Sequence, residues 1–229
     1  MNPALALPFS EIERLFLPDS MPAKNGWCVL PDGTGFSVVC TNMPLVTPEM
    51  EKWWNAWFVD PAYDYLNYRI WMPGLHFSYG SPIVENLGWG LVGLKIEKLL
   101  FPNDLRLSRP PEKLDPKYIH IIACCGNCTP IDEPDTESIC YLLIHCFKQS
   151  GKGIQIQTIN YMGIKWENGV SIKVHDVDPD QLHLFALHSA YEYHRMSVLL
   201  PKLYTYAQTL PNHGLNPSAL HPDLGQPFE

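Results

Sequence analysis

Hydrophobic and polar positions in the first third of the chain predict a β-hairpin followed by an amphipathic helix. Two short runs of β-branched and aromatic residues, 27–30 and 35–41, flank the turn sequence Pro31-Asp32-Gly33. Thr47-Pro48-Glu49 then supplies a capping hydroxyl, a first-turn proline and a first-turn acid, which together are typical of a helix start. Apolar residues recur afterwards on one helical face, at Met50, Trp53, Trp54, Trp57 and Phe58.

The remaining pattern predicts several strands and a long final helix. After a short segment at 64–71, strands are predicted at 90–101, 118–124, 138–147, 154–161 and 163–174. Asp178 and Pro179 are the cap and first position of the last helix, which reaches residue 200 and continues to 208 beyond a candidate kink at Pro201. This order of elements predicts an α+β fold in which a curved antiparallel sheet grips the C-terminal helix.

A single domain accounts for most of the chain. Residues 1–25 are rich in proline and poorly periodic, so we expect an N-terminal arm that lies on the core. Residues 209–229 are expected to form an exposed or wrapping C-terminal tail. The segment between them, 26–208, is long enough to bury one substantial core.

Composition narrows the classes of function. Lys and Arg total 16 against 24 Asp and Glu, a net charge of −8, which argues against a nucleic acid or an anionic membrane surface as partner. Hydrophobic residues make up 46% of the chain and charged residues only 17%, against about 25% charged in an average protein. Nine His, seven Trp and eleven Tyr add side chains that often line the pocket of a small-molecule site.

The sequence predicts a cytoplasmic protein with reduced cysteines. Residues 1–17 lack the basic and apolar regions of a secretory signal, and no run reaches the roughly 18 apolar residues that span a bilayer. Cys124, Cys125 and Cys128 form a C-C-x-x-C cluster, which is either half of a zinc knuckle, a redox pair or, preferably, a set of reduced thiols, since no second C-x-x-C exists. Small buried hydrophobes are expected at Cys28, Cys40, Cys140 and Cys146.

The last predicted helix carries one motif with metal-ligand chemistry. His188 and Glu192 are four residues apart, so both side chains leave one helix face about one turn apart. The pair is half of a workable zinc site, although a surface His–Glu pair that supports the helix has the same spacing. Apolar neighbours predict a largely buried helix, in which such a pair needs a partner. These neighbours are Leu184, Leu187, Tyr191 and Leu199.

The other half of a metal site has to come from elsewhere in the chain. His76 follows a rigid Pro-Gly turn and lies near Tyr68, Trp71 and Tyr79 in the sequence. A histidine in an ordinary loop has the same setting, so the sequence around His76 allows a structural interpretation as well.

Two further side chains are ambiguous on the residues alone. Glu97 lies inside an apolar run, on the same predicted strand face as Lys95, where it is either a ligand or a solvent-facing side chain. His120, on another predicted strand, is either an acid–base group or a buried structural histidine.

Several motifs resemble the 2,4-diacetylphloroglucinol hydrolase family, to which the phloretin hydrolases also belong. The resemblance covers most of 27–205 and includes the His188 and Glu192 pair. It is carried by Leu30-Pro-Asp-Gly-Thr-Gly-Phe36, Met43-Pro-Leu-Val-Thr-Pro-Glu-Met50, Trp53-Trp54 and Tyr68-Arg-Ile-Trp-Met-Pro-Gly-Leu-His76. It implies a helix-grip fold, like that of the birch-pollen allergens and START domains, with a zinc ion in the cavity and a homodimeric assembly.

The resemblance also implies a His, Glu, His, Glu set of zinc ligands. The histidine that ends the Y-[RK]-x-W-x-P-x-x-H motif matches His76, and the glutamate on the following strand best matches Glu97. The H-x-x-x-E motif on the last helix matches His188 and Glu192.

The chain departs from the family pattern in two places. Met72 stands where the family usually has a second histidine, between the Trp and Pro of the motif. The segment between His76 and Glu97 is shorter than in the bacterial hydrolases, which leaves Glu85 as the alternative ligand. The polar substrate contact expected just after the first histidine is Tyr79 here, which points to a different substrate.

The activity implied by the resemblance is hydrolysis of the carbon–carbon bond between an acyl group and a phenolic ring or a 1,3-dicarbonyl-like polyketide. Tyr68 and His120 are the predicted acid–base groups. The predicted substrate contacts are Tyr68, Trp71, Tyr79 and Tyr191. A cyclase or isomerase of a polyketide-like metabolite is the alternative, and a simple carrier of apolar ligands is disfavoured because it does not need the predicted metal ligands.

Overall fold

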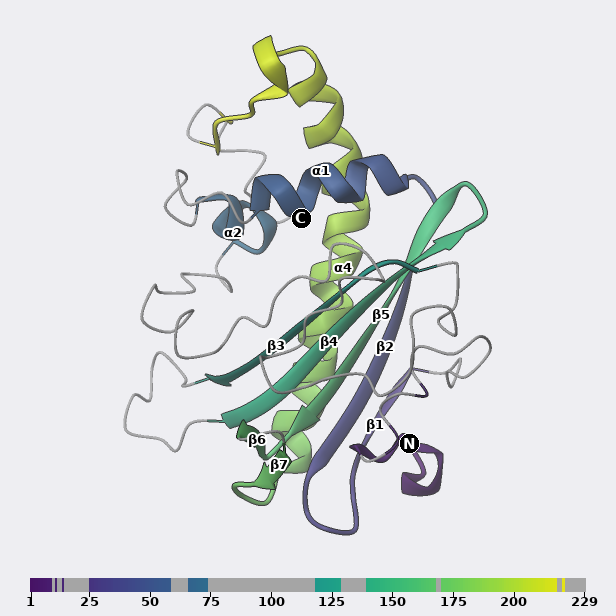
Figure 1. Cartoon of the computed structure of the whole chain (residues 1–229), viewed down its shortest axis with the longest axis vertical. Coiled ribbons are helices and arrows are strands. Elements are labelled where there is room, and N and C mark those ends of the chain that lie inside the picture. The colour runs from purple at the N-terminus through teal and green to yellow at the C-terminus, as the bar shows by residue number, and fades with distance from the viewer. Residues whose placement is uncertain are drawn as a thin grey trace.

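The computed structural model describes residues 1–9, 11, 14, 25–58, 66–73, 118–128, 139–167, 170–217 and 220. At its centre is a five-stranded antiparallel sheet in the order β1-β2-β5-β4-β3 (Figure 1). The five strands are β1 (Gly26–Val29), β2 (Gly35–Met43), β3 (Tyr118–Cys128), β4 (Ile139–Ser150) and β5 (Gly153–Met162). The strand predicted at 90–101 lies outside the described residues.

A long C-terminal helix, α4 (Pro179–Gln208), crosses one face of this sheet (Figure 1). Two shorter helices, α1 (Pro48–Phe58) and α2 (Leu66–Trp71), contact α4 near one end of the sheet. The described chain is therefore α+β, with an antiparallel sheet and a C-terminal helix, and this arrangement is compatible with a helix-grip fold. Within the described residues, no helix combines the length and the apolar character that crossing a membrane requires.

The predicted hairpin and first helix are confirmed. β1 and β2 pair antiparallel through a turn that needs glycine at position 33, where φ is +85°. A Cβ atom on Gly33 would lie 1.9 Å from Oδ1 of Asp176. Thr47 caps α1 as predicted, because its hydroxyl accepts a hydrogen bond from the N–H of Met50 at 3.3 Å.

One predicted strand needs correction. The segment 163–174 forms a hairpin of two short strands, β6 (Ile164–Glu167) and β7 (Val170–Lys173), in a separate two-stranded sheet. The intervening sequence Asn168-Gly169 is the dipeptide that most favours a two-residue hairpin turn, a signal that outweighs the continuous β-branched pattern. The continuation of the last helix to residue 208 is confirmed, because α4 runs through Pro201 to Gln208.

The two faces of the five-stranded sheet pack against different parts of the chain. We call the face toward α4 the inner face and the opposite one the outer face. Inner-face residues that pack with Tyr193, Met196, Leu199 and Leu200 of α4 include Phe147, Ile154 and Ile156. Outer-face residues that pack with Leu7 of the N-terminal arm include Phe36, Val38, Leu142, Ile144, Ile159 and Tyr161. Alternate positions of each strand therefore belong to two separate cores.

The described parts of both terminal segments are tied to the domain. Each contains a short 3-10 helix, η1 (Pro3–Leu5) or η6 (Pro211–His213). The hydroxyl of Tyr161 donates to the backbone carbonyl of Leu7 at 3.0 Å. The indole N–H of Trp57 donates to the carbonyl of Leu215 at 2.7 Å, so the chain after α4 folds back over α1.

Burial along α4 differs from the sequence prediction. Leu184, Leu187 and Tyr191 were expected to be buried, and they are 64, 52 and 47% exposed. The physical reason is helical phase: positions 182, 186, 189, 193, 196 and 200 pack against the sheet, and 184, 187 and 191 lie on the opposite side. Glu192, which lies between these two sides, is buried.

The described cysteine side chains agree with reduced thiols. Cys28 and Cys146 are buried, as predicted, Cys40 is partly buried, and these three thiols are not in disulfides. The C-C-x-x-C cluster lies along β3, which pairs with β4, but its side chains lie outside the described part of the structure, as does that of Cys140.

Candidate functional site

His188 and Glu192 approach one another on the flank of α4, between its sheet-facing and exposed sides. Nε2 of His188 lies 3.7 Å from Oε2 of Glu192, and the Glu192 side chain is only 7% exposed. Zinc bonds of about 2.0 to 2.2 Å to a His nitrogen and a Glu oxygen can bridge a separation of this size. The donor set and its spacing therefore fit half of a metal site.

Burial shifts both pKa values toward the uncharged form of each side chain. Desolvation raises the pKa of the Glu192 carboxyl well above its ordinary value and lowers the pKa of the His188 imidazole. The neutral imidazole is the form that binds a metal. A divalent cation beside Glu192 would offset the cost of burying its negative charge.

The C-terminal end of α2 is tied to the same turn of α4. The indole N–H of Trp71 donates to the backbone carbonyl of Glu192 at 2.9 Å. In return, Nε of Arg195 donates to the carbonyl of Trp71 at 2.6 Å, and its Nη2 donates to the carbonyl of Ile70 at 3.3 Å. These three hydrogen bonds fix where the chain leaves α2, shortly before the described segment ends at Pro73.

A second polar cluster lies between α4 and the inner face of the sheet. The hydroxyl of Tyr193 lies 2.9 Å from Nδ1 of His145, and the same nitrogen lies 3.2 Å from Oγ1 of Thr158. All three side chains are buried. The Tyr193 ring also packs edge to face on Trp71, with centroids 5.5 Å apart, so this cluster adjoins the turn that carries Glu192. Imidazole and phenol side chains are both groups that can act in general acid–base catalysis.

Some of the predicted site residues are among those described. Tyr68 is partly buried, and its ring lies edge to face with that of Trp71 at 6.4 Å. Tyr191 is exposed on the side of α4 away from the sheet. His120 lies on β3 in register with Phe147, and its side chain lies outside the described part of the structure. The structure therefore brings Trp71 to the His188–Glu192 turn, with Tyr68 against Trp71, and it places Tyr191 on another side of the helix.

The remaining predicted residues, His76, Tyr79, Glu97 and the alternative ligand Glu85, lie outside the described residues. Within the part of the chain that is described, no group of three or more His, Cys, Asp or Glu side chains is placed to hold a metal ion. His188 and Glu192 are thus two donors of a set whose other members stay predictions.

Sequence reasoning missed His145, Tyr193 and Arg195. The sequence signal for His145 was its position two residues before Phe147 in the apolar run 141–147, because alternate residues of a strand share one face. Tyr193 and Arg195 had no signal of their own, because their roles depend on contacts with β4 and α2. Both lie within three residues of Glu192 in the sequence.

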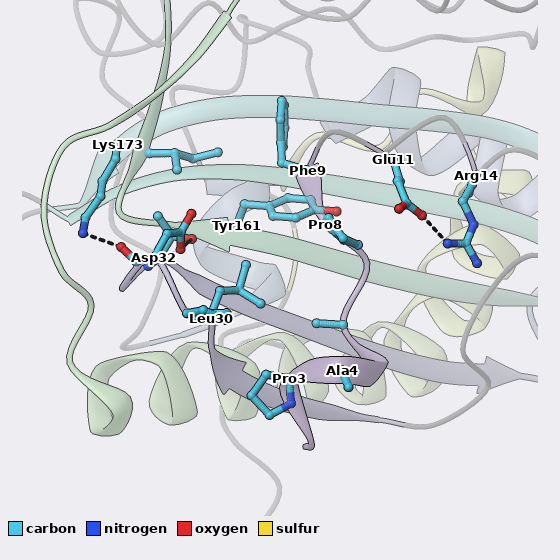
Figure 2. A pocket seen from close by; sticks show the side chains of 14 residues that line it. Pro3, Ala4, Pro8, Phe9, Glu11, Arg14, Leu30, Asp32, Tyr161 and Lys173 are labelled. Atoms are coloured by element: carbon cyan, nitrogen blue, oxygen red, sulfur yellow. Dashed lines mark hydrogen bonds and ion pairs between the residues drawn. The ribbon is translucent and has the colours of Figure 1, made fainter.

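A separate pocket of about 810 Å³ opens on the outer face, between the N-terminal arm and the β1–β2 turn (Figure 2). Apolar side chains that line it include Phe9, Leu30, Tyr161 and Ile164. Its charged groups pair among themselves or with the backbone: Glu11 bonds Arg14, and the Lys173 ammonium donates to the carbonyl of Asp32 (Figure 2). The predicted site residues do not line this pocket, so the candidate site stays on the flank of α4.

Comparison with known proteins gives one family. A family model described as the DAPG hydrolase PhiG domain matches residues 7–82 and 79–205, which together cover most of the chain. Comparison with curated proteins gives no match. The matched range includes α1, α2, the sheet and the part of α4 that carries His188 and Glu192.

Proposed function

The chain belongs to the DAPG hydrolase family, and we propose that it is a zinc-dependent hydrolase of carbon–carbon bonds. Its substrate would carry an acyl group on a phenolic ring or on a 1,3-dicarbonyl-like polyketide. The observation that carries the proposal is the pair of partly buried His188 and buried Glu192 on the flank of α4, within the matched range. The fold is proposed to be a helix-grip fold, in which the space between the sheet and α4 receives the substrate.

Four residues are proposed to hold the zinc ion: His76, Glu97, His188 and Glu192. Glu85 is the alternative to Glu97. Three features support a cation at the helix pair: a nitrogen and an oxygen at bridging distance, a carboxyl whose burial is costly without a positive charge, and an imidazole kept neutral by burial. A bound zinc ion supplies Lewis acidity toward a carbonyl oxygen and lowers the pKa of a bound water.

The residues around the pair are proposed to orient the substrate and to transfer protons to and from it. Cleavage makes the ring leave as a carbanion equivalent, so a ring carbon has to gain a proton. Tyr68 is proposed to orient the ring hydroxyls or deliver that proton, with His120 as the second acid–base candidate. The His145–Tyr193 pair is a further proton-holding group beside the same turn. Trp71 and Tyr79 are the proposed substrate contacts, whereas Tyr191 lies on the side of α4 away from the sheet.

Elemental analysis tests the proposal most directly. We expect about one zinc per chain in the purified protein, and release of an acyl product from 2,4-diacetylphloroglucinol or phloretin. His188→Ala should lose both the metal and the activity. His194→Ala is the matched control, because His194 is an exposed histidine of the same helix and should keep both. A metal-free protein whose turnover survives chelators contradicts the zinc proposal.

The mass of the product separates hydrolysis from the alternative chemistry. Hydrolysis adds water and splits the substrate into two products, whereas a cyclase or isomerase returns a product of unchanged mass. The alternative uses the same cavity and the same residues, so zinc content alone does not distinguish the two.

A homodimer is the proposed assembly. The exposed apolar residues Leu184, Leu187 and Tyr191 share one side of α4 and support an interface there. Light scattering of the purified protein tests this, and Leu187→Asp should lower the measured mass toward one chain if that side is the interface.

A further inference from the structure

Among the residues that the structure describes, the buried side chain of Asn160 lacks the hydrogen bonds that buried polar groups normally make. Its side chain is 0% exposed, and within the described part of the structure neither Nδ2 nor Oδ1 has a hydrogen-bond partner. A buried amide without partners costs stability, because its bonds to water are lost and nothing replaces them. Such a group in a folded protein therefore calls for an explanation.

The strand pairing places Asn160 on the inner face. It lies on β5, directly opposite Ser37 of β2 and Leu143 of β4. Thr158, two residues earlier on the same strand, belongs to the polar cluster that contacts α4. Because alternate residues of a strand share a face, the Asn160 side chain also points toward α4.

The part of α4 opposite Asn160 carries small side chains. Gly35 pairs with Met162, two residues after Asn160 on β5, and Leu182 of α4 packs against it. A Cβ atom added to Gly35 would lie 3.1 Å from the Leu182 side chain. His145 pairs with Thr158, two residues before Asn160 on β5, and it contacts Tyr193 of α4. The buried helix positions between these two anchors are Ala186, Ser189 and Glu192. Two of these three side chains, Ala186 and Ser189, are small, so this stretch of α4 presents little bulk to the inner face of the sheet.

This position adjoins the proposed zinc ligands. Ser189 directly follows His188 and lies three residues before Glu192, so it belongs to the turn of α4 that carries the pair. A flat ligand held at the pair from the sheet side would bring its ring substituents toward Asn160.

We propose that Asn160 is a specificity-determining residue that forms hydrogen bonds with a carbonyl oxygen and a hydroxyl group of one ligand. Nδ2 donates to the carbonyl oxygen, and Oδ1 accepts from the hydroxyl. The inference rests on the proposed function, since an acyl group beside a phenolic hydroxyl offers both partners. Analogues that lack one partner bind poorly because they leave a buried amide atom unpaired.

The rival explanation is that Asn160 serves only the fold. Asn160→Leu separates the two, because leucine has a similar size and no polar atoms. If the amide exists for a ligand, its removal relieves two unsatisfied groups, and the thermal midpoint of the ligand-free protein stays at least as high as that of the wild type.

The same strand offers a matched control. Gln157 is also buried, and its Oε1 has no hydrogen-bond partner among the described residues. It lies three residues before Asn160 and therefore points to the outer face. Gln157→Leu should leave ligand binding unchanged.

Calorimetric titration of the full-length protein with two probes tests the proposal. 2′-Hydroxyacetophenone offers both a carbonyl and a hydroxyl, and 2′-methoxyacetophenone lacks the hydroxyl donor. We expect the wild type and Gln157→Leu to bind the hydroxy probe roughly tenfold more tightly, the effect of about one hydrogen bond. In Asn160→Leu the two probes should bind within twofold of each other.

Two results would overturn the inference. One is a wild-type protein that does not distinguish the probes, and the other is an Asn160→Leu variant that still does. Because the titration needs no turnover, its outcome is independent of the hydrolase proposal. Discrimination through Asn160 without release of an acyl product refutes only the hydrolysis, whereas acyl release with unchanged discrimination in the variant refutes only the role of Asn160.

Discussion

The indole N–H of Trp71 donates to the backbone carbonyl of Glu192 at 2.9 Å, across 121 residues of sequence. This bond joins the end of α2, where the family-like motif of residues 68–76 begins, to the helix turn that carries the proposed ligand pair. The position of that turn relative to α2 therefore depends on an indole hydrogen bond as well as on apolar packing.

Trp71→Phe should lower the affinity for zinc in addition to lowering the free energy of unfolding. Phenylalanine keeps an aromatic ring against Tyr193 but loses the donor to Glu192. We expect a loss of about 1–3 kcal/mol in the free energy of unfolding, measured by urea denaturation. Zinc affinity, measured by competition with a chromophoric chelator, should fall as well.

Trp57→Phe is the control for that experiment. Trp57 is equally buried, and its indole N–H donates to the backbone carbonyl of Leu215 at 2.7 Å, away from the ligand pair. It should lose a similar amount of stability and keep the wild-type zinc affinity. Equal zinc affinity in both variants would contradict a role for Trp71 in placing Glu192.

Arg195 should contribute to stability through the two carbonyls that it binds. Arg195→Met leaves the carbonyls of Trp71 and Ile70 without this donor in a buried site. We expect a loss of about 2–4 kcal/mol in the free energy of unfolding by urea. Arg195→Lys should lose less, because an ammonium can still donate to one carbonyl. Lys52→Met on the exposed side of α1 should change stability by less than about 0.5 kcal/mol, and an equal loss there would refute the assignment.

Local sequence signals predicted the frame of the molecule. The turn at Gly33, the Thr47 cap and the Asp178-Pro179 helix start each act through neighbouring backbone atoms, so residue order is enough to read them. The strand predicted at 163–174 was wrong because a two-residue turn signal inside it was overlooked.

The candidate site was predictable only where its parts are close in sequence. His188 and Glu192 share a turn of one helix, and spacing alone brings them together. Arg195 bonds a residue 124 positions away, and Tyr193 one 48 positions away, so their roles follow from tertiary packing that no local pattern contains. The exposure of Leu184 and Leu187 was missed for a similar reason: apolar character does not reveal which side of a helix the sheet covers.

Asp32 should make stability depend on pH in the acid range. Its Oδ1 accepts hydrogen bonds from the N–H and the hydroxyl of Thr34 at 2.9 and 2.6 Å, and the bond from the hydroxyl is the main reason that its pKa lies below the ordinary value. A carboxyl with a lowered pKa in the folded state contributes stability above its unfolded pKa of about 3.9 and loses it as pH falls through the folded pKa.

Asp32→Asn removes that pH-dependent contribution. Because Asp32 is exposed, we expect a difference of less than about 1 kcal/mol at pH 7, measured by urea unfolding. The difference should shrink toward zero as the pH is lowered below 4. A difference that grows on acidification would contradict the stabilising role of the ionised carboxyl.

Glu192→Gln should separate folding from metal binding. Glu192 as a whole residue is 5% exposed, and the glutamine amide has the same shape as the carboxyl without the charge that is costly to bury. We therefore expect the metal-free variant to unfold at a temperature no lower than that of the metal-free wild type at pH 7. Zinc at one hundred times its dissociation constant should stabilise the wild type by about 2.7 kcal/mol and the variant by almost nothing. A variant that zinc still stabilises fully would remove Glu192 from the ligand set. A metal-free variant that unfolds at a much lower temperature would instead assign the buried carboxyl a structural role.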